Sequence, residues 1–196
     1  MKTILKITVI AMFMFASTAT FAYDSSLELF SKNNSKDLIF RYETQNLETK
    51  VRFGNDDNVF YSEEVSDKSL YLKKFNIKNL SDGNYFLAIE NSLKKVTYNI
   101  HVTGNIVVID DEIETLKPVF QKKNSSILMS FLNKGREKVK LTIYDNENNQ
   151  VYYEEFADKL VVEKAFDFTA IGYTDKNYRF VVKVKDELYF NELNVR

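Results

Sequence analysis

The sequence predicts an all-β protein made of two tandem Greek-key β-sandwich domains that follow an amino-terminal signal peptide. Two observations lead to this prediction. A stretch beginning at residue 60 returns ninety-one residues later, and the apolar residues follow the two-residue period of β-strands. The expected organisation is a signal peptide at 1–22, a first sandwich at 23–103, a connector at 104–117 and a second sandwich at 118–196.

The duplication is visible without gaps between residues 60–80 and 151–171, which share 7 identities in 21 positions. In the first copy the identical residues are Tyr61, Glu63, Glu64, Asp67, Lys68, Lys73 and Phe75. Weaker matches extend upstream at an offset of 90, pairing Leu38 with Leu128, and downstream at an offset of 93, pairing Tyr85 with Tyr178. Because the offset changes only at turn-like segments, the pattern indicates one scaffold with variable loops.

The amino end has the order of a secretory signal. Lys2 and Lys6 precede the apolar run 7–16, and small residues follow up to Ala22. Cleavage there leaves 174 residues starting at Tyr23, with no cysteine for lipid attachment and no later apolar run long enough to span a membrane. We therefore expect a periplasmic or extracellular protein without membrane insertion after cleavage.

Each copy contains about seven short runs rich in Val, Ile, Phe and Tyr, separated by Asn, Asp and Gly, which is typical of strands and tight turns. In the first copy the main expected strands are 38–42, 51–53, 59–65, 75–77, 85–89 and 96–102, preceded by 27–30. In the second copy they are 127–132, 139–143, 151–156, 161–168, 178–184 and 188–195, preceded by 119–120. No segment after the signal peptide shows a helical period.

Composition limits the possible partners. Without the signal peptide the chain has 25 basic and 28 acidic residues, a net charge of −3, which gives no electrostatic reason to expect nucleic acid or an anionic membrane. A hydrophobic fraction of 44% is enough for packed cores, and the absence of cysteine removes disulfides and thiolate metal sites. Packing alone must hold each domain.

The connector 104–117 is too apolar to be a flexible linker, because Ile106–Ile109 precedes the acidic run Asp110–Glu112. We expect a short strand packed on one sandwich or at their junction. The acidic run is interpreted as a solvated corner.

One local pattern in the first copy specifies the fold further. Phe75 and Ile77 end one strand, a turn contains Gly83, and Tyr85 opens the next strand. A tyrosine at this place can bond back to the upstream chain, as in the tyrosine corner of Greek-key sandwiches. Here the chain resembles fibronectin type III and immunoglobulin-like modules of bacterial secreted proteins. Through Leu80, Gly83 and Tyr85 it also resembles the C-terminal sorting domains of type IX secretion cargo, which implies an envelope setting and, as an alternative, a sorting role.

Candidate site residues have structural interpretations that we prefer. His101 is the one histidine and is expected on the surface. The runs 55–58 and 145–149 carry oxygen ligands suited to calcium, but they also lie where tight turns are expected. The pairs at 63–64 and 154–155 are not expected to act as glycosidase carboxylates, since neighbouring strand residues point to opposite faces.

These observations lead to a hypothesis without an active site. The sequence has no phosphate loop, nucleophile elbow or His-Glu-x-x-His motif, and we assign no catalytic, cofactor-binding or metal-binding residue and no cofactor. The expected function is a secreted non-enzymatic binding or structural module of the bacterial envelope that presents its domains to a protein or a glycan. The alternatives are a sorting accessory and a carbohydrate-binding protein that uses surface tyrosines such as Tyr152.

Overall fold

The computed structural model consists of strands joined by turns. It forms two compact units, and the boundary between them along the chain lies between Thr115 and Leu116. Among the described residues there is no helix, so none forms a helix that could cross a bilayer. The signal peptide expected at 1–22 and the turn residues Asp67 and Lys68 lie outside the described residues. The structure describes residues 27–31, 37–44, 46–66, 69–123, 126–168 and 176–195.

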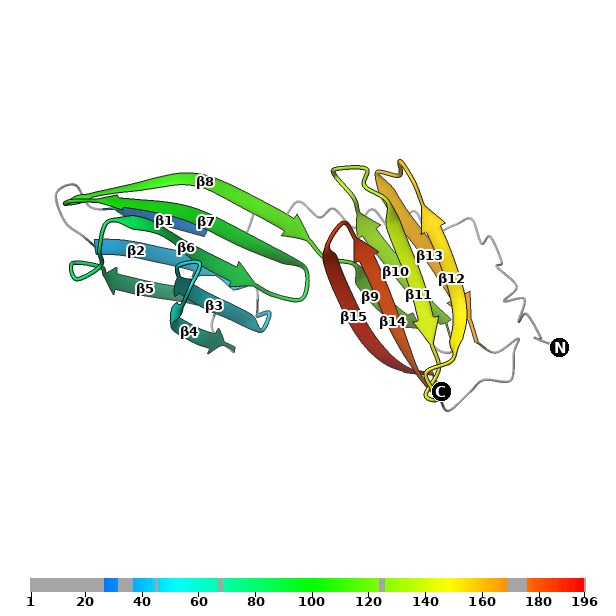
Figure 1. The fold of residues 1–196 in the computed structure, drawn as a ribbon. Coiled ribbons are helices and arrows are strands. Elements are labelled where there is room, and N and C mark those ends of the chain that lie inside the picture. The colour runs from blue at the N-terminus through cyan, green and yellow to red at the C-terminus, as the bar shows by residue number, and fades with distance from the viewer. Residues whose placement is uncertain are drawn as a thin grey trace. The chain divides into compact units, whose positions relative to one another are not determined.

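The first unit is a sandwich of a three-stranded sheet, β1-β2-β5, and a five-stranded sheet, β4-β3-β6-β7-β8 (Figure 1). All strand pairs whose register is given are antiparallel. The strands are β1 (Leu27–Ser31), β2 (Asp37–Glu43), β3 (Thr49–Gly54), β4 (Val59–Val65), β5 (Leu70–Asn76), β6 (Gly83–Glu90), β7 (Lys94–Thr103) and β8 (Ile106–Leu116).

The second unit repeats this plan with a three-stranded sheet, β13-β10-β9, and a four-stranded sheet, β12-β11-β14-β15 (Figure 1). Taken in chain order, strands one, two and five form one sheet and strands three, four, six and seven form the other. This is a Greek-key sandwich order, so the predicted fold class is confirmed. The strands are β9 (Val119–Lys123), β10 (Ser126–Leu132), β11 (Val139–Tyr144), β12 (Gln150–Phe156), β13 (Val161–Asp167), β14 (Lys176–Val184) and β15 (Glu187–Val195).

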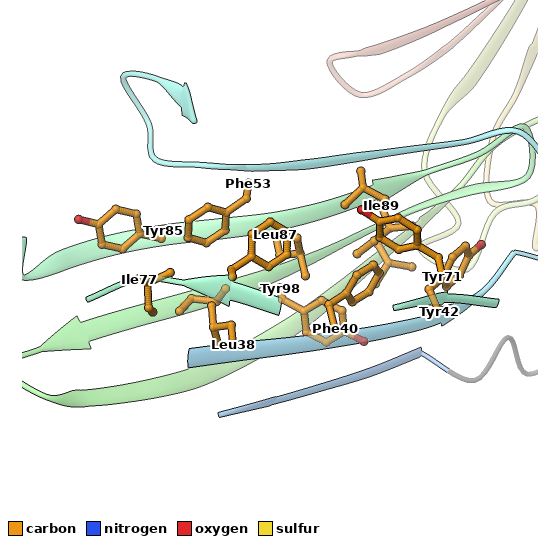
Figure 2. Packing of buried hydrophobic residues seen from close by; sticks show 14 of the residues in the cluster. Leu38, Phe40, Tyr42, Phe53, Tyr71, Ile77, Tyr85, Leu87, Ile89 and Tyr98 are labelled. Atoms are coloured by element: carbon orange, nitrogen blue, oxygen red, sulfur yellow. The ribbon is translucent and has the colours of Figure 1, made fainter. Parts of the chain in front are cut away.

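The core of the first sandwich follows directly from alternation along the strands. In β2, Leu38, Phe40 and Tyr42 are buried while the residues between them are not. Figure 2 shows these side chains opposite those of the larger sheet, among them Leu87 and Tyr98. Full burial of each such side chain contributes roughly 1.5–3 kcal/mol, and packing of this kind holds the sandwich without disulfides or thiolate-bound metal.

The core of the second sandwich is equally aromatic. Phe166 and Phe180 are both fully buried, with ring centroids 5.7 Å apart in an edge-to-face arrangement. Phe120 of β9 lies 5.2 Å from Phe180, so the first strand of this unit also packs on the core. The two sandwiches therefore have separate cores built from equivalent strands.

Strand registers define which residues of the two copies are equivalent. Tyr85 is paired with Ile100, and Tyr178 with Leu193, which confirms the predicted offset of 93 in this region. The upstream offset of 90 holds at β3 and β11, where Lys50 faces Glu64 and Lys140 faces Glu155, but it is wrong at β2 and β10. Leu38 faces Phe75, but Phe166 is faced by Ile127 and not by Leu128. Leu128 is 38% exposed, because a one-residue shift moves a strand side chain to the other face of the sheet.

The predicted tyrosine corner is present in the first sandwich. The hydroxyl of Tyr85 donates to the carbonyl of Ser81 across 2.8 Å, which joins the start of β6 to the turn before it. The ring stacks on Phe53 with centroids 6.1 Å apart, so its apolar part also belongs to the core. Tyr178 has the equivalent place in β14 and packs on Phe168 at 4.6 Å.

The expected connector contributes the eleven-residue strand β8, which lies beside β7 in the larger sheet of the first sandwich. Val107 and Ile109 pack against the core, and the turn before them is held by a bond from the Gly104 amide to Asp82 Oδ1 at 2.8 Å. The acidic run Asp110–Glu112 was wrongly predicted as a corner: it lies inside this strand. A run of carboxylates is tolerated there because β8 is an edge strand with one side in solvent.

Candidate functional site

Three of the residues shared by the two copies form a compact cluster in each sandwich, which we call the clasp. The first clasp is Tyr61, Glu63 and Lys73, and the second clasp is Tyr152, Glu154 and Lys164. In the first sandwich, β4 is an edge of the larger sheet and β5 an edge of the smaller sheet. Since Tyr61 and Glu63 come from β4 and Lys73 from β5, the clasp joins the two sheets along one open side of the sandwich.

The first clasp centres on the Glu63 carboxylate. Tyr61 donates its hydroxyl to this carboxylate, and Tyr71 donates to Glu63 Oε2 at 2.5 Å. Lys73 Nζ lies 3.7 Å from the same oxygen and 4.3 Å from the centroid of the Tyr61 ring. The ring of Tyr61 meets Phe75 edge-on at 5.2 Å, so the polar cluster lies directly on the aromatic core.

The second clasp repeats this arrangement. Tyr152 donates its hydroxyl to Glu154, and Lys164 Nζ lies 2.6 Å from Glu154 Oε2. The Tyr152 ring meets Phe166 edge-on at 5.1 Å, matching the contact between Tyr61 and Phe75. At the place of Tyr71 the second sandwich has the buried Val162, so one tyrosine donates to the second clasp carboxylate where two donate to the first.

The electrostatics of the clasp favour a structural role. Burial, followed by the hydrogen bond to Glu63, raises the pKa of Tyr71 far above its usual 10.0. Burial and the bond to Glu154 raise the pKa of Tyr152 in the same way. A general acid or base works best when its pKa is near the working pH, and these shifts move both tyrosines away from neutrality. The arrangement can hold two sheets together, and its two tyrosine hydroxyls are poorly suited to transfer a proton near neutral pH.

We predict that removing the clasp carboxylate destabilises the first sandwich. In a Glu63→Ala variant the hydroxyl of Tyr71, on a side chain that is 4% exposed, loses its carboxylate acceptor. The free energy of unfolding should fall by about 1–3 kcal/mol, measured by urea titration. Glu64→Ala is the matched control, because Glu64 pairs on the outer face with Lys50 at 3.7 Å and is 66% exposed. An equal loss in both variants would contradict the prediction.

The histidine predicted on the surface is there. His101 is exposed in β7, with Nδ1 at 2.7 Å from Asn84 Oδ1 and Nε2 at 2.9 Å from Thr103 Oγ1. Both neighbours are uncharged hydrogen-bonding groups, and in the described part of the chain no carboxylate takes the orienting place that a catalytic histidine needs.

The Asn- and Asp-rich runs act as turns, as predicted. Asn55 Oδ1 accepts from the amides of Asp57 and Asn58, at 3.2 and 2.8 Å. Asp145 Oδ1 accepts from the amides of Glu147 and Asn149, at 2.9 and 2.8 Å. These side-chain oxygens are used by the backbone of their own turn. Among the described residues, no three His, Cys, Asp or Glu side chains come together as a metal-binding group.

In each of the two adjacent glutamate pairs, the two side chains point to opposite faces of the strand, as predicted. Glu63 and Glu154 face the clasps, whereas Glu64 and Glu155 face outward toward lysines, Glu155 between Lys138 and Lys140 at 3.4 Å each. Tyr152 is half-buried in its clasp, and the neighbouring Tyr153, 47% exposed, is the tyrosine available on the outer surface. The glycan hypothesis therefore needs Tyr153 and not Tyr152.

The clasp was missed by sequence reasoning, although a signal for it was present. Both copies contain Tyr-x-Glu followed by Lys-x-Phe, with the lysine ten residues after the glutamate. The two residues of each motif have the spacing of one face of a strand. The recurrence was interpreted as a result of duplication alone. Repeated charged residues on the core side of two edge strands would have indicated a polar contact between the sheets.

No protein-family model and no curated protein matches this chain. Among solved structures, the chain is similar to a two-domain fibronectin type III segment from chicken tenascin, with 10% sequence identity and a TM-score of 0.32. The alignment covers 87% of this chain and 98% of the tenascin segment. The strand order given above, and not this likeness, assigns the fold.

Proposed function

We propose that the protein is a non-enzymatic binding or structural module, secreted into the bacterial envelope, that presents two sandwich domains to a protein or glycan partner. The observation that carries this proposal is that the charged residues repeated in both copies hold the two sheets of each sandwich together. Glu63, Lys73 and their counterparts Glu154 and Lys164 connect the sheets of their own sandwiches. What remains for recognition is the outer surface of strands and turns, which is the part that sandwich modules use to bind partners.

The envelope setting rests on the order of the first 22 residues, a basic start followed by an apolar run and small residues. Fractionation of cells that produce the full chain tests it directly. A processed protein beginning at Tyr23 in the periplasm or medium is the expected result. An unprocessed protein in the cytoplasm would remove the envelope part of the proposal.

Binding is tested with the processed chain immobilised at one terminus. We expect saturable capture of a component from envelope extract, which is then confirmed with the purified component, and no turnover of general ester, peptide and glycoside substrates. The decisive variant is Glu63→Gln, which keeps the shape of the clasp but removes its charge. Substrate turnover that this variant abolishes would overturn the non-enzymatic proposal, because it would make the first clasp an active site.

A glycan partner is favoured by one specific surface. Tyr153 is exposed on the outer face of the second sandwich beside Glu155 and its two lysines, and an exposed aromatic ring next to polar groups can stack on a sugar. We expect any glycan-array signal to be lost in Tyr153→Ala. Ser62→Ala is the matched control, because Ser62 has the equivalent place in the first sandwich. A signal that survives Tyr153→Ala would exclude this surface.

The three residues that resemble the type IX sorting signature have a structural role in the first sandwich. Leu80, Gly83 and Tyr85 form the corner between β5 and β6, where Tyr85 bonds to Ser81. A sandwich needs this corner whatever its function, so the binding proposal is preferred. Export of the chain truncated after Leu116 separates the two: retention in the periplasm would favour sorting, and unchanged export would exclude it.

A further inference from the structure

The two sandwiches differ at one edge of their larger sheets. In the first, β7 has β8 along its outer side. In the second, β15 has the place of β7, as the equivalent pairs Tyr85 with Ile100 and Tyr178 with Leu193 show. β15 is itself the last strand of its sheet. An edge that is covered by a strand in one copy therefore has no strand beside it in the other copy among the described residues, although Lys122 of β9 donates to the Asn194 carbonyl at 2.6 Å near the end of β15.

The core-facing side chains of β15, which has no described strand on its outer side, are less buried than those of β7, which has β8 there. Tyr98 and Ile100 of β7 are 6% and 1% exposed. Their equivalents on β15, Asn191 and Leu193, are only partly buried, and so is Tyr189, the equivalent of the buried Val96. In the first sandwich Val107 and Ile109 of β8 supply the additional cover. The second sandwich thus keeps core-facing surface that an added strand would bury.

Four of the other edge strands carry features that discourage pairing with another chain. β4 and β12 each contain an extra, unpaired residue, Phe60 and Val151, that shifts the register with the neighbouring strand, and both strands are held by the clasps. β9 ends in two lysines, and β8 carries the carboxylates Asp110, Asp111, Glu112 and Glu114. β15 differs from these four, because it pairs with β14 through nine residues in unbroken register. It also has no lysine, arginine, proline or glycine. Leu188 and Phe190 on its outer face are 49% and 63% exposed.

We propose that β15 pairs antiparallel with β15 of a second copy of this chain, across a two-fold axis at Asn191, so that the two four-stranded sheets become one. This register keeps the cores of both copies on the same face, since it pairs odd residues with odd and even with even. On the core face it sets Tyr189 opposite Leu193 of the second copy, and Asn191 opposite itself. On the outer face it sets Phe190 opposite Glu192, with no carboxylate facing another.

The charges on the two long edge strands, β8 and β15, favour pairing of β15 with β15 of a second copy over pairing of β15 with β8. β15 carries Glu187 and Glu192, so pairing with the acidic β8 would bring like charges together, which is unfavourable on neighbouring strands. A β15 pair avoids this, and closed two-fold assembly also leaves no open end for further growth. The inference is independent of the partner proposed above and would hold for a protein or a glycan ligand.

Two substitutions at one exposed position test the register. Phe190→Glu sets carboxylates opposite Glu192 on both sides of the axis, whereas Phe190→Lys sets opposite charges there. We expect the processed full chain to be a dimer by light scattering at submillimolar concentration, Phe190→Glu to raise the dimer Kd about tenfold or more, and Phe190→Lys to retain the dimer. The double variant Phe190→Glu with Glu192→Lys should restore it.

Cysteine trapping checks the same axis in a chain that has no cysteine of its own. In the proposed register the Cα atoms of the two Asn191 residues lie about 4.5–5.5 Å apart, which is within disulfide reach. Asn191→Cys should therefore give a disulfide-linked dimer. Glu192→Cys is the matched control, because its Cα atoms would lie about 8 Å apart, beyond disulfide reach. A monomer at all concentrations, equal effects of Phe190→Glu and Phe190→Lys, or a dimer lost on Ile106→Lys in β8 would each overturn the proposal.

Discussion

Replacing Phe180 by alanine is expected to lower the free energy of unfolding of the second sandwich by about 3–5 kcal/mol while leaving the first sandwich almost unchanged. Phe180 is fully buried and its ring lies 5.2 Å from Phe120 and 5.7 Å from Phe166. Removing it leaves a cavity between the two sheets that these rings cannot fill without leaving their own positions. For a domain of some eighty residues, with a total stability of about 4–12 kcal/mol, this is a large part of the whole.

The restriction to one sandwich follows from the separate cores. The equivalent variant in the first core is Phe40→Ala, whose ring is also fully buried and lies 5.9 Å from Tyr71. Each variant should move one of two urea transitions, followed by tyrosine fluorescence, since the chain has 12 tyrosines and no tryptophan. Leu160→Ala, at a side chain that is 45% exposed, should move neither. A single transition that both core variants shift equally would mean that the two sandwiches unfold as one unit.

The strands and cores were predictable because burial in a sandwich leaves a period of two in the sequence. The run from Leu38 to Tyr42 predicts a strand through its apolar and aromatic residues, and β2 contains it, with Leu38, Phe40 and Tyr42 buried in alternation. The tyrosine corner was predictable for a different reason: a turn with Gly83 followed by Tyr85 fixes a local geometry that depends on few other residues. Both features are decided by residues close together in the chain.

Features that depend on which strands become neighbours were less accessible. Residues 106–116 have no counterpart in the second copy, so the duplication gave no guidance on where β8 would lie. The clasp joins β4 to β5, and nothing in the sequence states that these strands face each other across the open side of the sandwich. The misalignment of Leu38 with Leu128 has the same origin, since identity of residue type was weighed without the register of the partner strand.

The second large effect is expected at alkaline pH, where the first sandwich should lose stability more steeply than the second. Burial, then the bond to Glu63, raises the pKa of Tyr71, and burial, then the bond to Glu112, raises the pKa of Tyr98, both from the usual 10.0. Above pH 10 the unfolded chain releases these protons and the folded chain keeps them. The stabilisation is thus complete below pH 10 and is lost as the pH rises toward the folded pKa values, by about 1.4 kcal/mol per pH unit for each tyrosine.

Two buried tyrosines give the first sandwich a slope that approaches about 3 kcal/mol per pH unit roughly one unit above pH 10, where the unfolded chain has released most of these protons. In the second sandwich the pKa is raised at Tyr152, which is half-buried, and at Tyr153, which is exposed, so solvent reduces the effect of these two groups. Urea titrations at increasing pH, with tyrosinate absorbance recorded in parallel, measure both slopes. Tyr98→Phe should reduce the slope of the first sandwich by about half, because phenylalanine has no proton to release. Equal slopes in the two sandwiches, or a slope that Tyr98→Phe leaves unchanged, would show that these hydroxyls are not held protonated by the fold.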